Sequence, residues 1–136
     1  MGALRFKISE EGNFLDDDDS NPTPPWSSLR ELEAAVKSFE EDDQPNMKEL
    51  LALLVVPGSS LGGARPKANV LDKNGNLWIA KFPSKNDTID KAAWDYLAYR
   101  LAINVGINMS ETKIQKLTSS YHTFFTKRFD RNGSYR

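Results

Sequence analysis

The chain has 136 residues, enough for one domain with a modest hydrophobic core. Its formal net charge is −1 and it has no cysteine, which argues against bulk electrostatic binding to nucleic acid or membranes and excludes disulfides and thiolate metal sites. The single histidine, His122, argues against a histidine-based metal centre and a Ser-His-Asp triad. No apolar run reaches the roughly 18 residues of a membrane span, and MGALRFK lacks the apolar core of a signal peptide, so we expect a cytoplasmic protein.

The first residues predict a strand followed by an acidic loop. Residues 1–8 alternate loosely between apolar and polar, as in a short strand. Residues 9–26 contain the run Asp16–Asp19 and three prolines, which together oppose regular structure. A calcium loop would need alternating oxygen ligands around a glycine turn, so we interpret this segment as a solvated loop.

Two helices are predicted next. Ser27 or Ser28 is expected to cap the helix SSLRELEAAVKSFEE, with its glutamates early and outside. Helical spacing assigns its buried face to Leu29, Leu32, Ala35, Val36 and Phe39. Residues 46–55 predict the second helix, between Pro45 and Pro57.

A loop of small residues then precedes a hairpin, in VPGSSLGGARPKANVLDKNGNLWIAKF. Asp72 and Gly75 stand at the first and fourth positions of a type I turn with a glycine bulge. Alternation in the second strand puts Trp78, Ala80 and Phe82 on one face and Leu77, Ile79 and Lys81 on the other. Lys81 therefore either extends to a sheet edge or meets an anion in a cleft.

The next predicted helix covers residues 88–104 and is capped by Asn86 or Asp87. Its apolar stripe comprises Ile89, Ala92, Ala93, Tyr96, Leu97 and Leu101. Asp95 lies beside this stripe. On a helix that directly follows the lysine strand, its carboxylate is placed to pair with Lys81.

The last part of the chain predicts two more strands. Gly106 ends the helix, and residues 111–117 and 121–129 alternate as strands around a turn at Ser119-Ser120. His122 is expected to be a packed or exposed histidine without chemistry.

The order of these elements is the layout of a kinase nucleotide lobe. Loop amides can cradle phosphates, a strand lysine grips phosphate oxygens, and a helix carboxylate holds the lysine. The segment GSSLGGARPKA does not fit the P-loop pattern. We therefore predict an α+β fold, a kinase-like N-lobe with a small antiparallel sheet, a glycine-rich loop and packed helices. It forms a single domain over residues 1–136, with a first part at 1–57 and the loop, hairpin, helix and hinge at 58–136.

Four segments also resemble the HipA family of serine/threonine kinases, the toxins of bacterial toxin–antitoxin pairs. They are PGSSLGGARPKA, LWIAKFPSKND, YLAYRLAINVGINM and TKRFDR. MGALRF resembles a segment inside HipA-like chains, so the resemblance covers nearly the whole sequence.

The resemblance implies roles for individual residues. Ser60 corresponds to the loop serine that the family autophosphorylates, Lys81 to the lysine that grips ATP, and Ile79 to a residue that touches adenine. Asp95 stands where the family usually has a helix glutamate, which shortens the carboxylate arm by one methylene. The remaining ATP-binding positions implied are the loop residues Leu61, Gly62, Gly63 and Ala64 and the hinge residues Lys127 and Phe129.

In a kinase the catalytic aspartate and the Mg²⁺-binding aspartate belong to the C-terminal lobe, and this chain stops just after the expected hinge. We therefore expect a catalytically incomplete fragment that binds ATP, with no catalytic or metal residue of its own and with the Mg²⁺ ligands in the missing lobe. The resemblance implies a parent that phosphorylates a protein such as an aminoacyl-tRNA synthetase and is restrained by a HipB-like helix-turn-helix antitoxin, which binds DNA itself. The alternative is a non-catalytic interaction module or regulatory subunit that does not bind ATP.

Overall fold

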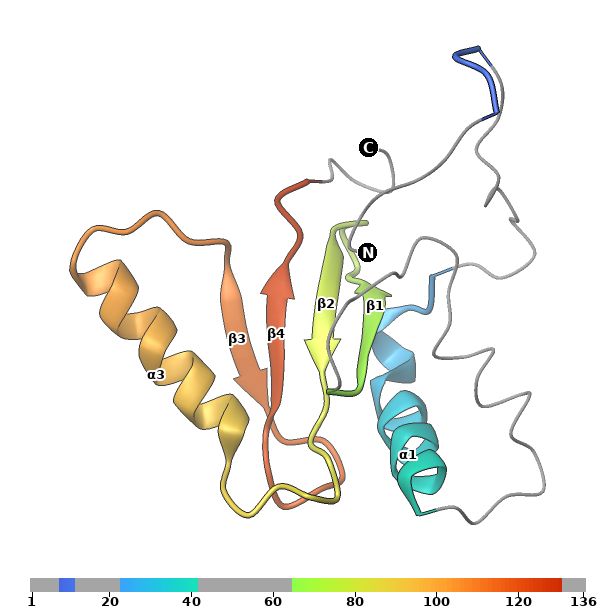
Figure 1. Ribbon diagram of the computed structural model, residues 1–136, viewed down its shortest axis with the longest axis vertical. Coiled ribbons are helices and arrows are strands. Elements are labelled where there is room, and N and C mark those ends of the chain that lie inside the picture. Colours follow the sequence, from blue (N-terminus) through green and yellow to red (C-terminus); the bar gives the residue numbers. More distant parts are fainter. Residues whose placement is uncertain (1–7, 12–22, 42–64, 131–136) are drawn as a thin grey trace.

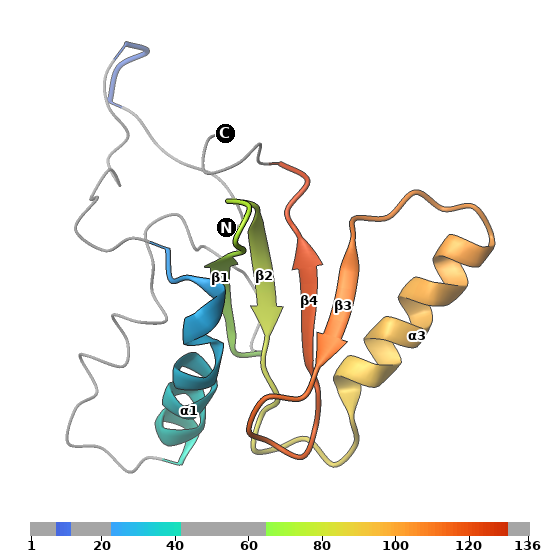
Figure 2. The ribbon, with the colours of Figure 1, turned by 180° about the vertical axis from the view of Figure 1, so that it is seen from behind.

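The computed structural model describes residues 8–11, 23–41 and 65–130, and these have the predicted α+β fold. In chain order the elements are the 3₁₀ turn η1 (Trp26–Ser28), α1 (Leu29–Glu40), β1 (Lys67–Leu71), β2 (Leu77–Lys81), α3 (Lys91–Asn104), β3 (Thr112–Gln115) and β4 (Thr123–Lys127). The strands form one antiparallel sheet in the order β1-β2-β4-β3, with α1 and α3 towards opposite edges (Figures 1 and 2).

Several predictions concern other parts of the chain. Residues 1–7 of the first strand, the aspartate run, the helix over residues 46–55 and the glycine-rich loop up to residue 64 lie outside the described residues. No helix among the described residues is long and apolar enough to cross a membrane.

The hairpin between β1 and β2 has the predicted turn. The Gly75 N–H donates to the Asp72 carbonyl over 3.0 Å, and the Asp72 N–H donates to the Asn76 carbonyl over 3.0 Å. Gly75 has a φ of 76°, the left-handed conformation that a glycine bulge requires. The turn fixes the register of the two strands, including Lys67 opposite Lys81.

The core lies between α1 and one face of the sheet. Its buried residues are Leu29, Leu32, Val36, Ala68, Val70, Trp78, Ala80, Phe82 and Phe125. The alternation predicted for β2 is confirmed, since Trp78, Ala80 and Phe82 are buried in this core.

Three details of α1 differ from the sequence prediction. The helix follows a 3₁₀ turn, and the Ser28 side chain makes no capping hydrogen bond. Phe39 is 41% exposed, because it stands in the last turn, whereas the core contacts come from the first two. Glu33 is buried rather than outside, because position 33 falls on the same helical face as Leu29 and Val36.

The predicted start and packing of α3 are also wrong. Its cap is Asp90, whose Oδ1 accepts a hydrogen bond from Ala93 N–H over 3.1 Å, because Asp87 is held by other partners. Of the predicted apolar stripe only Ala92 is buried, and Leu101 is 57% exposed. The reason is that α3 contacts β3 and β4 at one side of the sheet and does not lie across it (Figure 1).

The end of α3 follows the sequence prediction. Gly106 has a φ of 82°, its N–H donates to the Ile103 carbonyl, and the Ile107 N–H donates to the Ala102 carbonyl. These bonds form a Schellman motif, which a glycine at this position favours.

Candidate functional site

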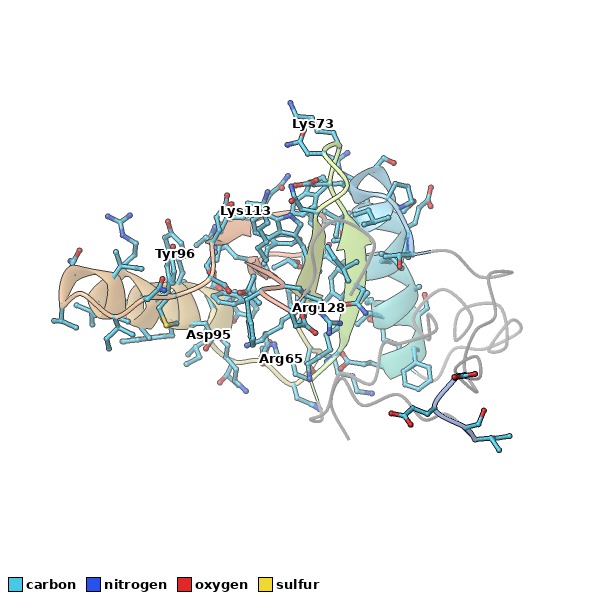
Figure 3. The ribbon with its side chains drawn as sticks, turned by 90° about the horizontal axis from the view of Figure 1, so that it is seen from above. Arg65, Lys73, Asp95, Tyr96, Lys113 and Arg128 are labelled. Atoms are coloured by element: carbon cyan, nitrogen blue, oxygen red, sulfur yellow. The ribbon has the colours of Figure 1, made fainter. Side chains whose placement is uncertain are left out.

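The sheet face opposite the core carries the lysine singled out in the sequence. Residues paired across antiparallel strands point to the same face, so the register defines its members. They include Lys67 and Asn69 on β1, Ile79 and Lys81 on β2, and Phe124 and Thr126 on β4. Seen from above, Arg65 and Asp95 lie on this side and Lys113 on the side of the core (Figure 3).

Lys81 is held from two directions. Its Nζ lies 3.6 Å from Asp95 Oδ2 on α3 and 4.8 Å from the centroid of the Phe124 ring. The Lys81 and Asp95 side chains are 34% and 47% exposed, so solvent screens the pair and its contribution to stability is small. The contacts orient the ammonium while leaving it accessible to a ligand.

Lys67 stands directly opposite Lys81 across the hairpin. The Phe82 N–H donates to the Pro66 carbonyl, so by the alternation of an antiparallel ladder the two lysines form a non-hydrogen-bonded pair, in which side chains are closest. Partial burial, followed by the charges of Lys81 and Arg65, lowers the pKa of Lys67 below its ordinary value of 10.5.

Arg65 is fixed at the same end of the sheet by Asp87. The guanidinium donates to both carboxylate oxygens, over 3.2 and 2.7 Å. Asp87 also accepts the Ser84 N–H and pairs with Lys91 Nζ at 3.2 Å. Burial raises the pKa of Asp87, but the bonds from Ser84, Arg65 and Lys91 outweigh it and hold that pKa below 3.8.

The expected hinge residues stand towards the other end of β4. Lys127 lies opposite Trp78, next to the Ile79–Thr126 pair, and its N–H donates to the Glu111 carbonyl over 2.8 Å. Phe129 is 92% exposed. The structure thus orders Lys81, Ile79 and the Lys127 backbone from one end of the sheet towards the other, while the register puts the Lys127 side chain on the same face as Trp78.

Arg128 covers the hinge end of this face. Its Nε and Nη2 donate to Asp130 over 2.8 and 2.5 Å, and its Nη1 lies 3.5 Å from Asn69 Oδ1 on β1. The side chain is buried and reaches from the end of β4 across to β1 (Figure 3 labels it).

Sequence reasoning missed three of these basic residues and one pairing. Arg65, Lys67 and Arg128 were not assigned to the site, although alternation counted back from the Asp72 turn puts Lys67 on the Lys81 face. His122 Nδ1 lies 2.5 Å from Asp90 Oδ2, so this histidine contacts the side chain of Asp90, which caps α3.

Some predicted site residues are not described by the structure. Ser60, Leu61, Gly62, Gly63 and Ala64 lie outside the described residues, which resume at Arg65. Arg65 and Lys67 are therefore the described basic residues that lie closest in sequence to the predicted phosphate loop.

Comparison with known proteins gives one match. Residues 59–136, more than half of the chain, match the family model described as the HipA-like C-terminal domain. No curated protein and no solved structure matches the chain. The matched region begins in the glycine-rich loop and includes the whole sheet and α3, and its description does not itself establish an ATP-binding lobe. By this match, the chain belongs to the HipA-like family.

Proposed function

We propose that this chain is the ATP-binding N-terminal lobe of a HipA-like kinase. The observation that carries the proposal is the Lys81–Asp95 pair on a sheet face that continues through Ile79 to the end of β4. A strand lysine held by a helix carboxylate is the arrangement by which kinases grip nucleotide phosphates.

The nucleotide would lie along this face in one direction. Its adenine would contact Ile79 and bond the backbone at the hinge. Because Lys127 N–H donates to Glu111, Lys127 would contribute its carbonyl and Phe129 its N–H. The phosphates would then extend towards Lys81 and the amides of residues 61–64, which include no bulky charged side chain.

Mg²⁺ would be bound mainly by groups outside this face. Among the described residues, no three histidine, aspartate or glutamate side chains cluster as a metal site. Asp87 and Asp95 are each engaged by cations. The proposal therefore assigns the Mg²⁺ ligands and the catalytic aspartate to a second lobe, so this chain alone would not transfer phosphate.

Regulation and partners follow from the same proposal. Phosphorylation of Ser60 would add about −1.5 to −2 charges to the loop and repel the ATP phosphates, switching the kinase off. The partners would be the second lobe, a HipB-like antitoxin and a protein substrate such as an aminoacyl-tRNA synthetase, in the cytoplasm.

A non-catalytic interaction module is the second candidate. It is favoured by the apolar side chains that α3 exposes, among them Trp94, Leu97 and Leu101. Exposed apolar surface of this kind marks many protein-binding sites.

ATP titration of the chain, followed by ¹H–¹⁵N NMR, separates the two candidates. We expect weak ATP binding, with the largest shifts at Ile79, Lys81 and residues 127–129. Lys81→Met should weaken it by about tenfold or more, because a hydrogen bond to a charged group is worth roughly 1.5–3 kcal/mol.

Lys73→Met is the matched control, since Lys73 lies exposed in the turn at the opposite end of the hairpin. It should bind ATP like the unaltered chain. Equal ATP affinity in the Lys81 variant, or shifts confined to the exposed side of α3, would rule out the nucleotide site.

A further inference from the structure

Arg128 stands between the two hinge residues of the proposed nucleotide site, Lys127 and Phe129. β4 ends at Lys127. One residue further, the Arg128 N–H donates to the Leu77 carbonyl over 2.9 Å, which continues the pairing with β2 just past the end of the strand. The Arg128 side chain is only 6% exposed although it carries a charge. Both the backbone and the side chain of this residue are therefore held in place.

The buried guanidinium closes a ring around Phe129. Nε donates to Asp130 Oδ1 over 2.8 Å and Nη2 to Asp130 Oδ2 over 2.5 Å, so side chains join the residues on either side of Phe129. A bidentate pair of this kind fixes direction as well as distance. Phe129 itself is 92% exposed, so its own side chain contributes little to holding the segment.

The same guanidinium links the hinge to β1. Nη1 lies 3.5 Å from Oδ1 of Asn69, which is buried and stands opposite Ile79 in the register. Because β2 lies between β1 and β4, the Arg128 side chain crosses β2 on the candidate face. The hinge is thereby positioned relative to Ile79, the residue proposed to contact adenine.

We infer that Arg128 is a positioning residue for the adenine end of the nucleotide. Its contacts hold the two backbone groups assigned to adenine, the Lys127 carbonyl and the Phe129 N–H, before the nucleotide binds. This inference rests on the proposed function and adds a residue that acts through the hinge. Replacing a buried ion pair by apolar side chains of similar volume often costs no stability, so we assign the pair with Asp130 the role of fixing geometry. A hinge that is already ordered spares the ligand the entropy cost of ordering it.

Adenosine and inorganic tripolyphosphate, titrated separately into the 136-residue chain and followed by ¹H–¹⁵N NMR, test the two ends of the site. We expect Arg128→Met to weaken adenosine binding by about tenfold, the order of the cost of ordering one residue's backbone. Tripolyphosphate binding should stay unchanged. Arg100→Met, which replaces an exposed arginine on α3, should change neither affinity. Unchanged adenosine binding in the Arg128 variant would overturn the inference, and so would equal losses for both ligands.

Arg128→Lys separates geometry from charge. Lysine keeps the positive charge but cannot reproduce the planar, two-pronged contact with a carboxylate. The Lys variant should therefore lose nearly as much adenosine affinity as the Met variant. Full affinity in the Lys variant would show that the charge alone is sufficient and that the bidentate pair does not position the hinge.

A second measurement needs no substitution. In the unaltered chain without ligand, ¹⁵N relaxation should give the Phe129 amide an order parameter of about 0.85, the value of rigid backbone, although its side chain is exposed. An order parameter below about 0.6 would mean that the hinge is not held before binding. That result would overturn the inference even if the Arg128 variants failed to fold.

The outcomes also separate this inference from the function it rests on. If Lys81→Met weakens ATP binding but Arg128→Met binds adenosine like Arg100→Met, the nucleotide site stands and the positioning role of Arg128 is wrong. If the unaltered chain binds neither ATP nor adenosine, both proposals fall.

Discussion

Asp72 accepts four hydrogen bonds within its own hairpin. The donors are Asn74 N–H, Asn76 N–H, Asn76 Nδ2 and Trp78 Nε1, at 2.8 to 3.1 Å. Burial raises the pKa of Asp72, but these bonds, led by those from Asn76, outweigh it and lower the pKa from 3.8 to about 2. The carboxylate thus stabilises the turn that sets the register of Lys67 and Lys81.

The lowered pKa of Asp72 predicts how stability depends on acid. Its stabilising contribution should be complete above pH 3.8, the ordinary pKa, and should be lost as the pH falls towards about 2. Asp72→Asn should lower the free energy of unfolding by about 1–2 kcal/mol at pH 7, since it replaces a charged acceptor of several bonds. Urea denaturation at pH 7 and at pH 2 measures both values.

The difference in free energy of unfolding between the unaltered chain and the Asp72→Asn variant should be smaller at pH 2 than at pH 7. Asp130→Asn serves as a control outside the hairpin, because Asp130 bonds to Arg128 after β4. A deficit of the Asp72 variant that is equally large at pH 2 and at pH 7 would show that the charge of Asp72 does not stabilise the turn.

At the scale of elements, Glu33 connects α1 to the loop between β3 and β4. Its carboxylate accepts hydrogen bonds from the N–H and hydroxyl groups of Thr118 and Ser119 and from the Thr123 hydroxyl. Burial raises the Glu33 pKa, but the bonds from Thr118 and Ser119 outweigh it, so the group is held as a carboxylate. These donors satisfy a buried charge without a described cation.

Loss of this carboxylate should remove the bonds from Thr118 and Ser119 and leave the buried Thr123 hydroxyl without this acceptor. We expect Glu33→Ala to lower the free energy of unfolding by about 2–3 kcal/mol, because hydrogen bonds to a charged group are lost together with the acceptor of a buried hydroxyl. Glu41→Ala, directly after the same helix, should change it by less than about 0.5 kcal/mol, because the ion pair that Glu41 makes with Lys37 within the described residues is exposed to solvent. Thermal or urea unfolding followed by circular dichroism compares them; equal losses would contradict the role given to Glu33.

Local patterns in the sequence predicted the turns, strand faces and helix ends better than the contacts between residues far apart in the chain. The Asp72–Gly75 turn, the two faces of β2 and the glycine end of α3 depend on neighbouring residues, and the structure agrees with each. The burial of Glu33 depends on a loop 85 residues away, which no local pattern reveals. Asp87 could cap a helix by residue type, but Arg65, 22 residues earlier, engages it instead.

At the scale of the whole molecule, local patterns in the sequence likewise do not reveal the long-range contacts of the candidate site. Alternation places Lys81 and Ile79 on one face. The contact between the Arg128 side chain and Asn69, however, depends on the strand order β1-β2-β4-β3. The apolar stripe of α3 predicted a buried helix face, whereas Ile89, Leu97 and Leu101 of that stripe are exposed and only Ala92 is buried. Apolar periodicity shows that a face is suited to burial, but it does not identify what covers it.

The described fold thus has its main core on one side of the sheet, which predicts an unequal response to substitutions. Phe125 on β4 is fully buried in that core, in contact with the Trp26 ring at 4.7 Å between centroids. Phe125→Ala should therefore lower the free energy of unfolding by about 3–5 kcal/mol. Leu101→Ala on α3 should change it by no more than about 0.5 kcal/mol, because Leu101 is largely exposed and alanine is an equally good helix former. Urea unfolding of the two variants measures the contrast. A loss of 2 kcal/mol or more for Leu101→Ala would mean that the exposed side of α3 is covered in solution, and the main core would then not be confined to the α1 side.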